Sequence, residues 1–137
     1  MKKSQKVILI LDDEIGIVET IKSQLIDVFG NDFTYEYAIS GEEGLELIQE
    51  LNKENIDILI TISDWLMPGM NGDEFLVRLH HIVPEAIKIM VTGQATNEAI
   101  QRAYREANLY RVIHKPWLQS ELIQTIRDSL EDRERGN

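Results

Sequence analysis

Short, nearly continuous apolar runs alternate along this sequence with longer segments whose apolar residues recur at spacings of three and four. Five such runs occur within the 137 residues. A run that is apolar throughout is typical of a strand covered on both faces, and the longer segments are typical of amphipathic helices. The alternation therefore predicts β/α units around a mostly parallel sheet, which is an α/β fold.

The expected elements follow one another in strict alternation. Strands are predicted at Lys6–Leu11, Phe33–Ala38, Ile56–Ser63, Ala86–Val91 and Tyr110–Ile113. Helices are predicted at Ile15–Phe29, Gly41–Lys53, Asp73–Ile82, about Ala95–Ala107 and Leu118 to about Arg133. The fourth helix presents a thin apolar face built mostly from alanines, and such a face buries little area per turn. We expect this helix to be the one that is displaced most easily.

Length, charge and composition narrow the class of protein. The chain accommodates one compact domain, expected at residues 6–131, with a short leader at 1–5 and a charged tail at 132–137. The absence of Cys excludes disulfide frameworks and thiolate zinc sites. A net charge of −10 argues against binding to nucleic acid, because affinity for phosphate backbones comes largely from Lys and Arg.

No segment of the sequence is typical of a membrane protein. The apolar run behind the first lysines is interrupted by Asp12 and Asp13, so it is too short for a signal peptide or a membrane span. We therefore expect a cytoplasmic domain that contacts neither a membrane nor nucleic acid.

Unusual polar residues follow four of the five predicted strands. Asp12 and Asp13 follow the first strand, Asp64 the third, Thr92 the fourth and Lys115 the fifth. Ligands bind at the carboxyl ends of the strands in a parallel α/β sheet, so we expect these side chains to be neighbours. Carboxylates that meet without a cation repel one another and raise their pKa values. An all-oxygen site of this kind selects Mg²⁺, with Mn²⁺ as the alternative.

The strand-end residues belong to longer motifs that resemble a known family. The segment Asp64–Gly72, the pair Thr92-Gly93 and the pair Lys115-Pro116, together with the first acid pair, are similar to the receiver domain of two-component response regulators, in the CheY-like superfamily. Each piece alone is common, but all four in this order are specific, and they cover residues 6–130. The resemblance implies a doubly wound, five-stranded parallel sheet of order 2-1-3-4-5, flanked by five helices.

The resemblance also implies roles for the acidic residues. Asp64 would be the phosphoacceptor, attacking a phosphohistidine of a sensor histidine kinase or of a phosphotransfer protein. Asp13 and Asp64 would bind Mg²⁺ directly, Asp12 through water, and the backbone carbonyl of Leu66 would add a ligand.

The remaining roles concern the phosphoryl group and the output. Lys115 would supply a fixed cation, and Thr92 would donate its hydroxyl to a phosphoryl oxygen. Movement of Thr92 and of the fourth helix would then control an output domain or an effector protein. The resemblance also implies that two copies of the chain could form a homodimer. The domain would be a signalling switch and not a turnover enzyme. The apolar Leu66 should hinder hydrolysis of the phosphoryl form.

Several residues have simpler interpretations. Asp12 or Asp13 alone would most often cap the first helix, and a cis peptide bond before Pro116 is a family expectation. Surface positions are expected for the three histidines, and packing or partner contacts for the two tryptophans. These residues are His80, His81 and His114, and Trp65 and Trp117.

One position departs from the family pattern. Receivers often have an aromatic residue three positions before the lysine, and here that position is Val112. Two-residue alternation would place Tyr110 on the same face of the strand as Val112. Tyr110 could then take the place of the aromatic residue that is missing at position 112.

Two other functions compete with the receiver interpretation. A Mg²⁺-dependent phosphohydrolase with an aspartyl nucleophile needs Asp-x-Asp after the first strand, whereas this chain has Asp12-Asp13-Glu14. A binding module that kept the fold but lost the switch would not need Asp64, Thr92 and Lys115 together. Both alternatives therefore rank below the receiver.

Overall fold

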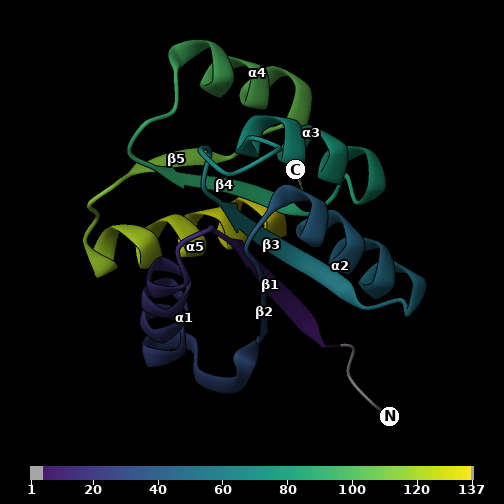
Figure 1. Ribbon diagram of the computed structural model, residues 1–137. Helices are drawn as coiled ribbons and strands as arrows, with labels where there is room; N and C mark the ends of the chain where they lie inside the picture. Colours follow the sequence, from purple (N-terminus) through teal and green to yellow (C-terminus); the bar gives the residue numbers. More distant parts are fainter. Residues whose placement is uncertain (1–4, 137) are drawn as a thin grey trace.

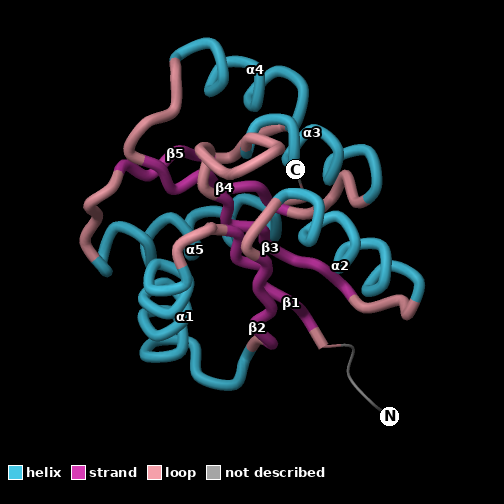
Figure 2. The backbone as a smooth tube through the Cα atoms, in the orientation of Figure 1, coloured by secondary structure: helices cyan, strands magenta, loops and turns pink. Residues whose placement is uncertain are grey.

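The computed structural model describes residues 5–136 and shows one parallel sheet with helices on both faces (Figures 1 and 2). The strands are β1 (Lys6–Leu11), β2 (Thr34–Ala38), β3 (Asp57–Ser63), β4 (Ile87–Thr92) and β5 (Arg111–His114). The helices are α1 (Ile15–Phe29), α2 (Gly41–Lys53), α3 (Gly72–Ile82), α4 (Asn97–Ala107) and α5 (Gln119–Glu134), with a short 3₁₀ turn at Gly30–Asp32. The strand order is β2-β1-β3-β4-β5, which confirms the predicted fold.

The element boundaries agree closely with those predicted from the sequence. β1, α1 and α2 begin and end at the predicted residues, and every other boundary lies within two positions of its predicted residue. α4 begins at Asn97 and not at Ala95, because the Thr96 hydroxyl caps it by accepting a hydrogen bond from the Ala99 amide at 3.1 Å. The leader predicted at 1–5 lies almost wholly outside the described residues.

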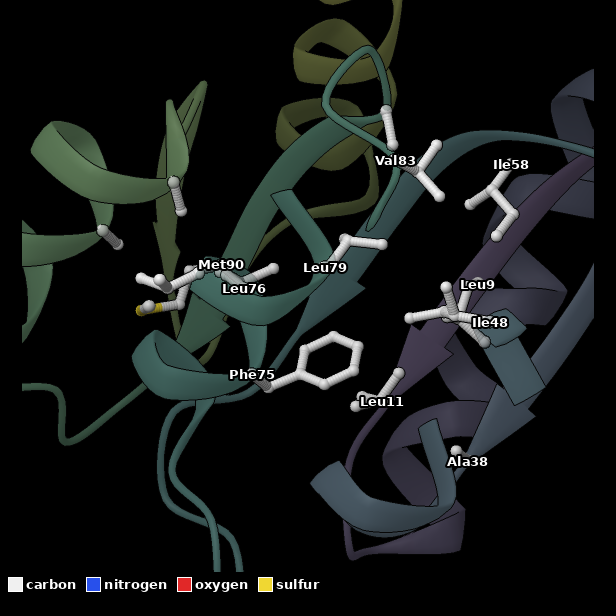
Figure 3. Packing of buried hydrophobic residues seen from close by; sticks show 14 of the residues in the cluster. Leu9, Leu11, Ala38, Ile48, Ile58, Phe75, Leu76, Leu79, Val83 and Met90 are labelled. Carbon is white, nitrogen blue, oxygen red and sulfur yellow. The ribbon is translucent and has the colours of Figure 1, made fainter. Parts of the chain in front are cut away.

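The sheet separates two hydrophobic cores. One core lies beneath α2, α3 and α4, and the other beneath α1 and α5. In Figure 3 the ring of Phe75 points from α3 toward Leu11 of β1. A Cβ atom at Gly44 would lie 2.8 Å from Leu11 and 2.9 Å from Phe75, so a glycine is needed for α2 to approach this closely. This packing fixes the carboxyl end of β1, where the acid pair begins.

Strand register brings the four polar loops to one edge of the sheet. Leu11 of β1 pairs with Ser63 of β3, and the Asp64 amide donates to the Leu11 carbonyl at 2.9 Å. On the other side of the sheet, Thr92 pairs with His114, and the Lys115 amide donates to the Thr92 carbonyl at 3.1 Å. The residue that follows each strand is therefore held at the same edge.

The prediction that Tyr110 shares a face with Val112 is wrong. Val112 packs against the core beneath α2, α3 and α4, whereas Tyr110 packs against the core beneath α1 and α5. The Tyr110 hydroxyl also donates to Asp132 Oδ2 at 2.7 Å. Two-residue alternation fails here because β5 begins only at Arg111, so Tyr110 lies before the regular strand.

A buried lysine in β4 was not expected from the sequence. Lys88 is only 1% exposed, and its ammonium donates to the Pro84 carbonyl at 2.9 Å. His80 Nδ1 lies 2.7 Å from the same ammonium, so the prediction that His80 is a plain surface residue is wrong. His81 and His114 are exposed, as predicted.

Stability should depend on pH through Lys88. Burial lowers the pKa of Lys88 from its ordinary 10.5 to about 8, with Glu85 raising it and Arg133 lowering it further. Between these pH values the unfolded chain binds more protons than the folded chain, so this group makes stability rise with pH. We expect Lys88→Met to remove a rise on the order of 3 kcal/mol, measured by urea unfolding between pH 7.5 and 10.5. Identical pH profiles for the two proteins would contradict this assignment.

Candidate functional site

A cavity of about 430 Å³ opens where β1, β3, β4 and β5 end. Its lining includes five of the six residues that the sequence assigned to this site. These lining residues are Asp13, Asp64, Leu66, Thr92 and Lys115. Asp12, which is 1% exposed, lies next to them through its contact with Lys115. The structure therefore brings together every residue that the sequence predicted to lie at this edge.

Three carboxylates converge beside the cavity. Asp12, Asp13 and Asp64 each offer an oxygen atom, and these atoms lie within 4.8 Å of one another. Asp12 and Asp64 are buried and Asp13 is exposed. Burial raises the pKa of Asp12, an effect that the hydrogen bond from Lys115 only partly offsets. Hard oxygen ligands at this spacing suit Mg²⁺, so the residues present fit such an ion.

Lys115 bridges two of these acids. Its ammonium donates to Asp12 Oδ2 at 2.9 Å and to Asp64 Oδ2 at 3.3 Å. Burial lowers the pKa of Lys115, but the hydrogen bond and charge of Asp12 and the charge of Asp64 outweigh burial and raise it overall. Lys115 is therefore a fixed cation beside both carboxylates. The peptide bond between Lys115 and Pro116 is cis, as the resemblance implied.

Backbone amides hold the second oxygen of each buried acid. The Trp65 amide donates to Asp64 Oδ1 at 2.7 Å, and the Glu14 amide donates to Asp12 Oδ1 at 2.9 Å. Glu14 is the residue that precedes the first turn of α1, so neither Asp12 nor Asp13 occupies the capping position. The capping interpretation of this acid pair is wrong.

The loop after β3 packs closely against the Asp64 backbone because residue 72 is a glycine. The Gly72 amide donates to the Trp65 carbonyl at 2.7 Å. A Cβ atom at Gly72 would lie 2.0 Å from the backbone oxygen of Asp64, closer than any side chain allows. Gly69, in the same loop, has φ of +81°, a conformation that favours glycine. These two glycines explain why the motif Asp64–Gly72 closes tightly around the acid.

Thr92 connects the cavity to the loop that leads into α4. Its side chain is buried, and its hydroxyl oxygen accepts a hydrogen bond from the Gln94 amide at 3.3 Å. Any displacement of Thr92 therefore acts on the segment that precedes α4.

The two tryptophans contact neighbouring elements, as predicted, but each also donates a hydrogen bond that the sequence did not reveal. Trp117 Nε1 donates to Gln24 Oε1 of α1 at 2.8 Å, and Trp65 Nε1 donates to Asp73 Oδ1 of α3 at 2.8 Å. Asp73 carried no signal in the sequence beyond its place in the first turn of a predicted helix.

Comparison with known proteins agrees with this arrangement of fold and acids. A model of the response regulator receiver domain matches residues 8–127. The chain belongs to the response regulator receiver family. Members of this family are signalling domains that bind Mg²⁺ through acidic residues and interact with histidine kinases and output domains.

Individual relatives support the same family. Chemotaxis protein CheY-3 of Vibrio cholerae is 32% identical over 119 residues, which covers 85% of each chain. The hydrogenase transcriptional regulatory protein HoxA of Cupriavidus necator is 29% identical over 131 residues, covering 96% of this chain and 25% of HoxA. The chain thus spans about a quarter of the length of the HoxA relatives.

A solved structure shows the same fold. The CheY-like receiver domain protein of Methanospirillum hungatei JF-1 is 31% identical, with a TM-score of 0.84, covering 98% of this chain and 100% of that one. Within residues 5–136, the helices are all too short or too polar to cross a membrane.

Proposed function

We propose that this chain is the phosphoacceptor domain of a two-component response regulator and that Asp64 receives the phosphoryl group. The observation that carries the proposal is the bridge from the Lys115 ammonium to Asp12 at 2.9 Å and to Asp64 at 3.3 Å, inside an acidic cluster that opens to a cavity. The donor is a phosphohistidine on a sensor histidine kinase or on a phosphotransfer protein. The domain extends over residues 6–131, and its cellular compartment is the cytoplasm.

The transfer uses groups that are already in place. An Asp64 carboxylate oxygen attacks phosphorus, the bond from phosphorus to the histidine nitrogen breaks with its electron pair, and an acyl phosphate forms on Asp64. Negative charge spreads over the phosphoryl oxygens in the transition state. Lys115, fixed beside Asp64 at 3.3 Å, stabilises that charge without reorganising, and the Thr92 hydroxyl, which also lines the cavity, donates to a phosphoryl oxygen.

The acid cluster would hold a Mg²⁺ ion. Asp13, Asp64 and the Leu66 backbone carbonyl would bind it directly, and Asp12 would bind it through water. When bound, Mg²⁺, or Mn²⁺ in its place, would supply positive charge to offset the charge of the phosphoryl group. Three carboxylates meet here beside the single ammonium of Lys115, so a divalent cation would balance the remaining negative charge.

The output is a changed surface and not a released product. The phosphoryl group draws Thr92 inward, and the Gln94 amide, bonded to the Thr92 hydroxyl at 3.3 Å, follows. α4 then shifts, because its buried face consists of the small residues Ala99, Ala103 and Ala107. The shifted face controls an output domain, an effector protein or a second copy of the chain.

Phosphoryl uptake should depend on Mg²⁺ and on Asp64. We expect intact-mass measurement after incubation with acetyl phosphate and Mg²⁺ to show one phosphoryl adduct, which EDTA and Asp64→Asn both abolish. Asp57→Asn is the matched control, because Asp57 begins the same strand at its far end. An adduct that survives in Asp64→Asn would contradict the assignment of the phosphoacceptor.

The phosphoryl form should be long-lived. Leu66 lines the cavity, is 48% exposed and offers no polar atom to orient an attacking water. We expect the adduct to persist for minutes or longer after the donor is removed, as followed by intact mass. Leu66→Asn adds one water-binding group worth about 1 kcal/mol and should shorten the lifetime roughly fivefold. Leu118→Asn, at an exposed position outside the cavity lining, should leave it unchanged. Decay of the wild-type adduct within seconds would refute the argument.

A further inference from the structure

Hydrogen bonds connect the acid at the end of β3 to α4 by way of α3. Trp65 makes two of them: its backbone amide donates to Asp64 Oδ1 at 2.7 Å, and its indole Nε1 donates to Asp73 Oδ1 at 2.8 Å. The other oxygen of Asp73 accepts a hydrogen bond from the Arg102 guanidinium at 3.3 Å. A continuous path of three contacts therefore leads from the Asp64 carboxylate to the middle of α4.

Asp73 is the branch point of this path. Its side chain is 14% exposed, and each of its two oxygens accepts from a different element. One donor is on the loop after β3 and the other is on α4. Because a single carboxylate satisfies both donors, displacement of either one changes the position of the acceptor for the other.

Arg102 holds α4 against the first turn of α3. Besides its contact with Asp73, its guanidinium donates to Glu74 Oε1 at 2.8 Å, and its Nε lies 3.4 Å from Glu106 Oε1 of its own helix. The hydrogen bond from Arg78, and after it the one from Arg102, lowers the pKa of Glu74, and the hydrogen bond to Glu74 raises the pKa of Arg102, so both groups stay charged at neutral pH. This ion-paired group joins two helices and not only residues of one helix.

The polar contacts carry a large share of the attachment of α4. The buried residues of α4 are alanines, and each buries little apolar area. On the β5 side, Val112 has no polar group, and the Tyr110 hydroxyl is bound to Asp132 at 2.7 Å on the opposite face of the sheet. Weakening of the bonds from Arg102 to Asp73 and Glu74 of α3 should therefore move α4 readily.

We propose that Trp65, Asp73 and Arg102 are positioning residues through which the state of the Asp64 side chain sets how tightly α4 is held against α3. The inference rests on the proposed function, since it takes phosphorylation of Asp64 as the input. In the acyl phosphate neither oxygen of the Asp64 carboxyl group keeps the charge of a carboxylate, so each is a weaker acceptor, and phosphorylation weakens the bond from the Trp65 amide. Trp65 then shifts, and its indole displaces the Asp73 carboxylate to which it is hydrogen-bonded. The bond from Arg102 to Asp73 weakens as a result, so α4 is held less tightly against α3.

The test is hydrogen exchange of the α4 backbone amides, measured with and without phosphorylation from acetyl phosphate and Mg²⁺. In the wild-type chain we expect phosphorylation to speed this exchange at least about fivefold, the lower end of typical coupling between sites. In Asp73→Asn and in Arg102→Gln we expect faster basal exchange and a response of less than about twofold. The double variant should respond no less than either single variant, because one broken link already interrupts the path.

The matched control is Arg78→Gln. Arg78 also binds Glu74, with its Nε at 2.7 Å from Oε2, but its contact stays within α3 and does not reach Asp73. A purely structural role would lower the melting temperature of a variant without changing the ratio of exchange rates between the two phosphorylation states. We expect Arg78→Gln to retain the full wild-type ratio.

The outcomes separate this inference from the function on which it rests. A full wild-type response in both Asp73→Asn and Arg102→Gln, with the phosphoryl adduct visible by mass in the same samples, would overturn the inference alone. An equal loss in Arg78→Gln would also overturn it. A wild-type chain that takes up no phosphoryl group would refute the proposed function first, and the inference with it.

Discussion

Lys115→Met should slow phosphoryl uptake from acetyl phosphate by about 10²-fold to 10³-fold, the usual effect of removing one preorganised group that stabilises transition-state charge. The Lys115 ammonium lies 2.9 Å from Asp12 Oδ2 and 3.3 Å from Asp64 Oδ2, so it is fixed beside the reacting carboxylate. Methionine keeps most of the length of the side chain but has no charge. The rate is measured as the growth of the phosphoryl adduct by intact mass at saturating Mg²⁺.

The same variant should bind Mg²⁺ more tightly. Lys115 and the ion share Asp12 and Asp64 as partners, so removing the lysine frees both carboxylates for the metal. Without Mg²⁺ the variant should be less stable by about 3 kcal/mol or more, because a buried acid loses its charge partner. Lys53→Met, at an exposed position at the end of α2, is the control and should change none of these quantities. Unchanged uptake in Lys115→Met would contradict the role given to the ammonium.

Gly72→Ala should destabilise the fold by about 3 kcal/mol or more, the upper range for forcing a methyl group into packed space. The new Cβ atom would lie 2.0 Å from the Asp64 carbonyl oxygen and 2.9 Å from the Trp65 Cα atom, and both of these are backbone. The Asp64 carbonyl is also held by the Ser63 hydroxyl at 2.8 Å, so it cannot retreat freely. The loop must shift instead, which displaces the phosphoacceptor and slows phosphoryl uptake.

Gly16→Ala is the matched control for this substitution. A Cβ atom at Gly16 meets nothing within 4 Å, and the residue lies in the first turn of α1. Alanine has the higher helix propensity, so we expect this variant to gain up to about 1 kcal/mol. Urea unfolding of both variants measures the contrast. Equal stabilities for Gly72→Ala and Gly16→Ala would show that the close approach at Gly72 is not a real constraint.

The sequence predicts the fold of this chain well because its strands are buried on both faces. The apolar run of β1 could be only a central strand, and its predicted bounds agree with the structure. Polar residues at the ends of such strands are conspicuous, so the sequence alone singles out Asp12, Asp64 and Lys115. The parallel sheet then brings them together without further information from the sequence.

Contacts between side chains on different elements could not be predicted in this way. The pairing of Lys88 with His80 joins β4 to α3, and a lysine within an apolar strand gives no sign of the partner that it finds. The contact of Trp65 with Asp73 crosses a loop whose path depends on Gly69 and Gly72. The face of Tyr110 is also not predictable from strand periodicity, because that periodicity holds only inside a strand and β5 begins one residue after Tyr110.

The most direct test of the central claim identifies the residue that carries the phosphoryl group. After incubation with acetyl phosphate and Mg²⁺, borohydride reduces an aspartyl phosphate to homoserine, and mass spectrometry of the peptides locates the altered residue. We expect homoserine at position 64 alone, and only when Mg²⁺ and the donor are both present. Homoserine at Asp12 or Asp13, or no reducible acyl phosphate at any position, would contradict the assignment of Asp64 as the phosphoacceptor.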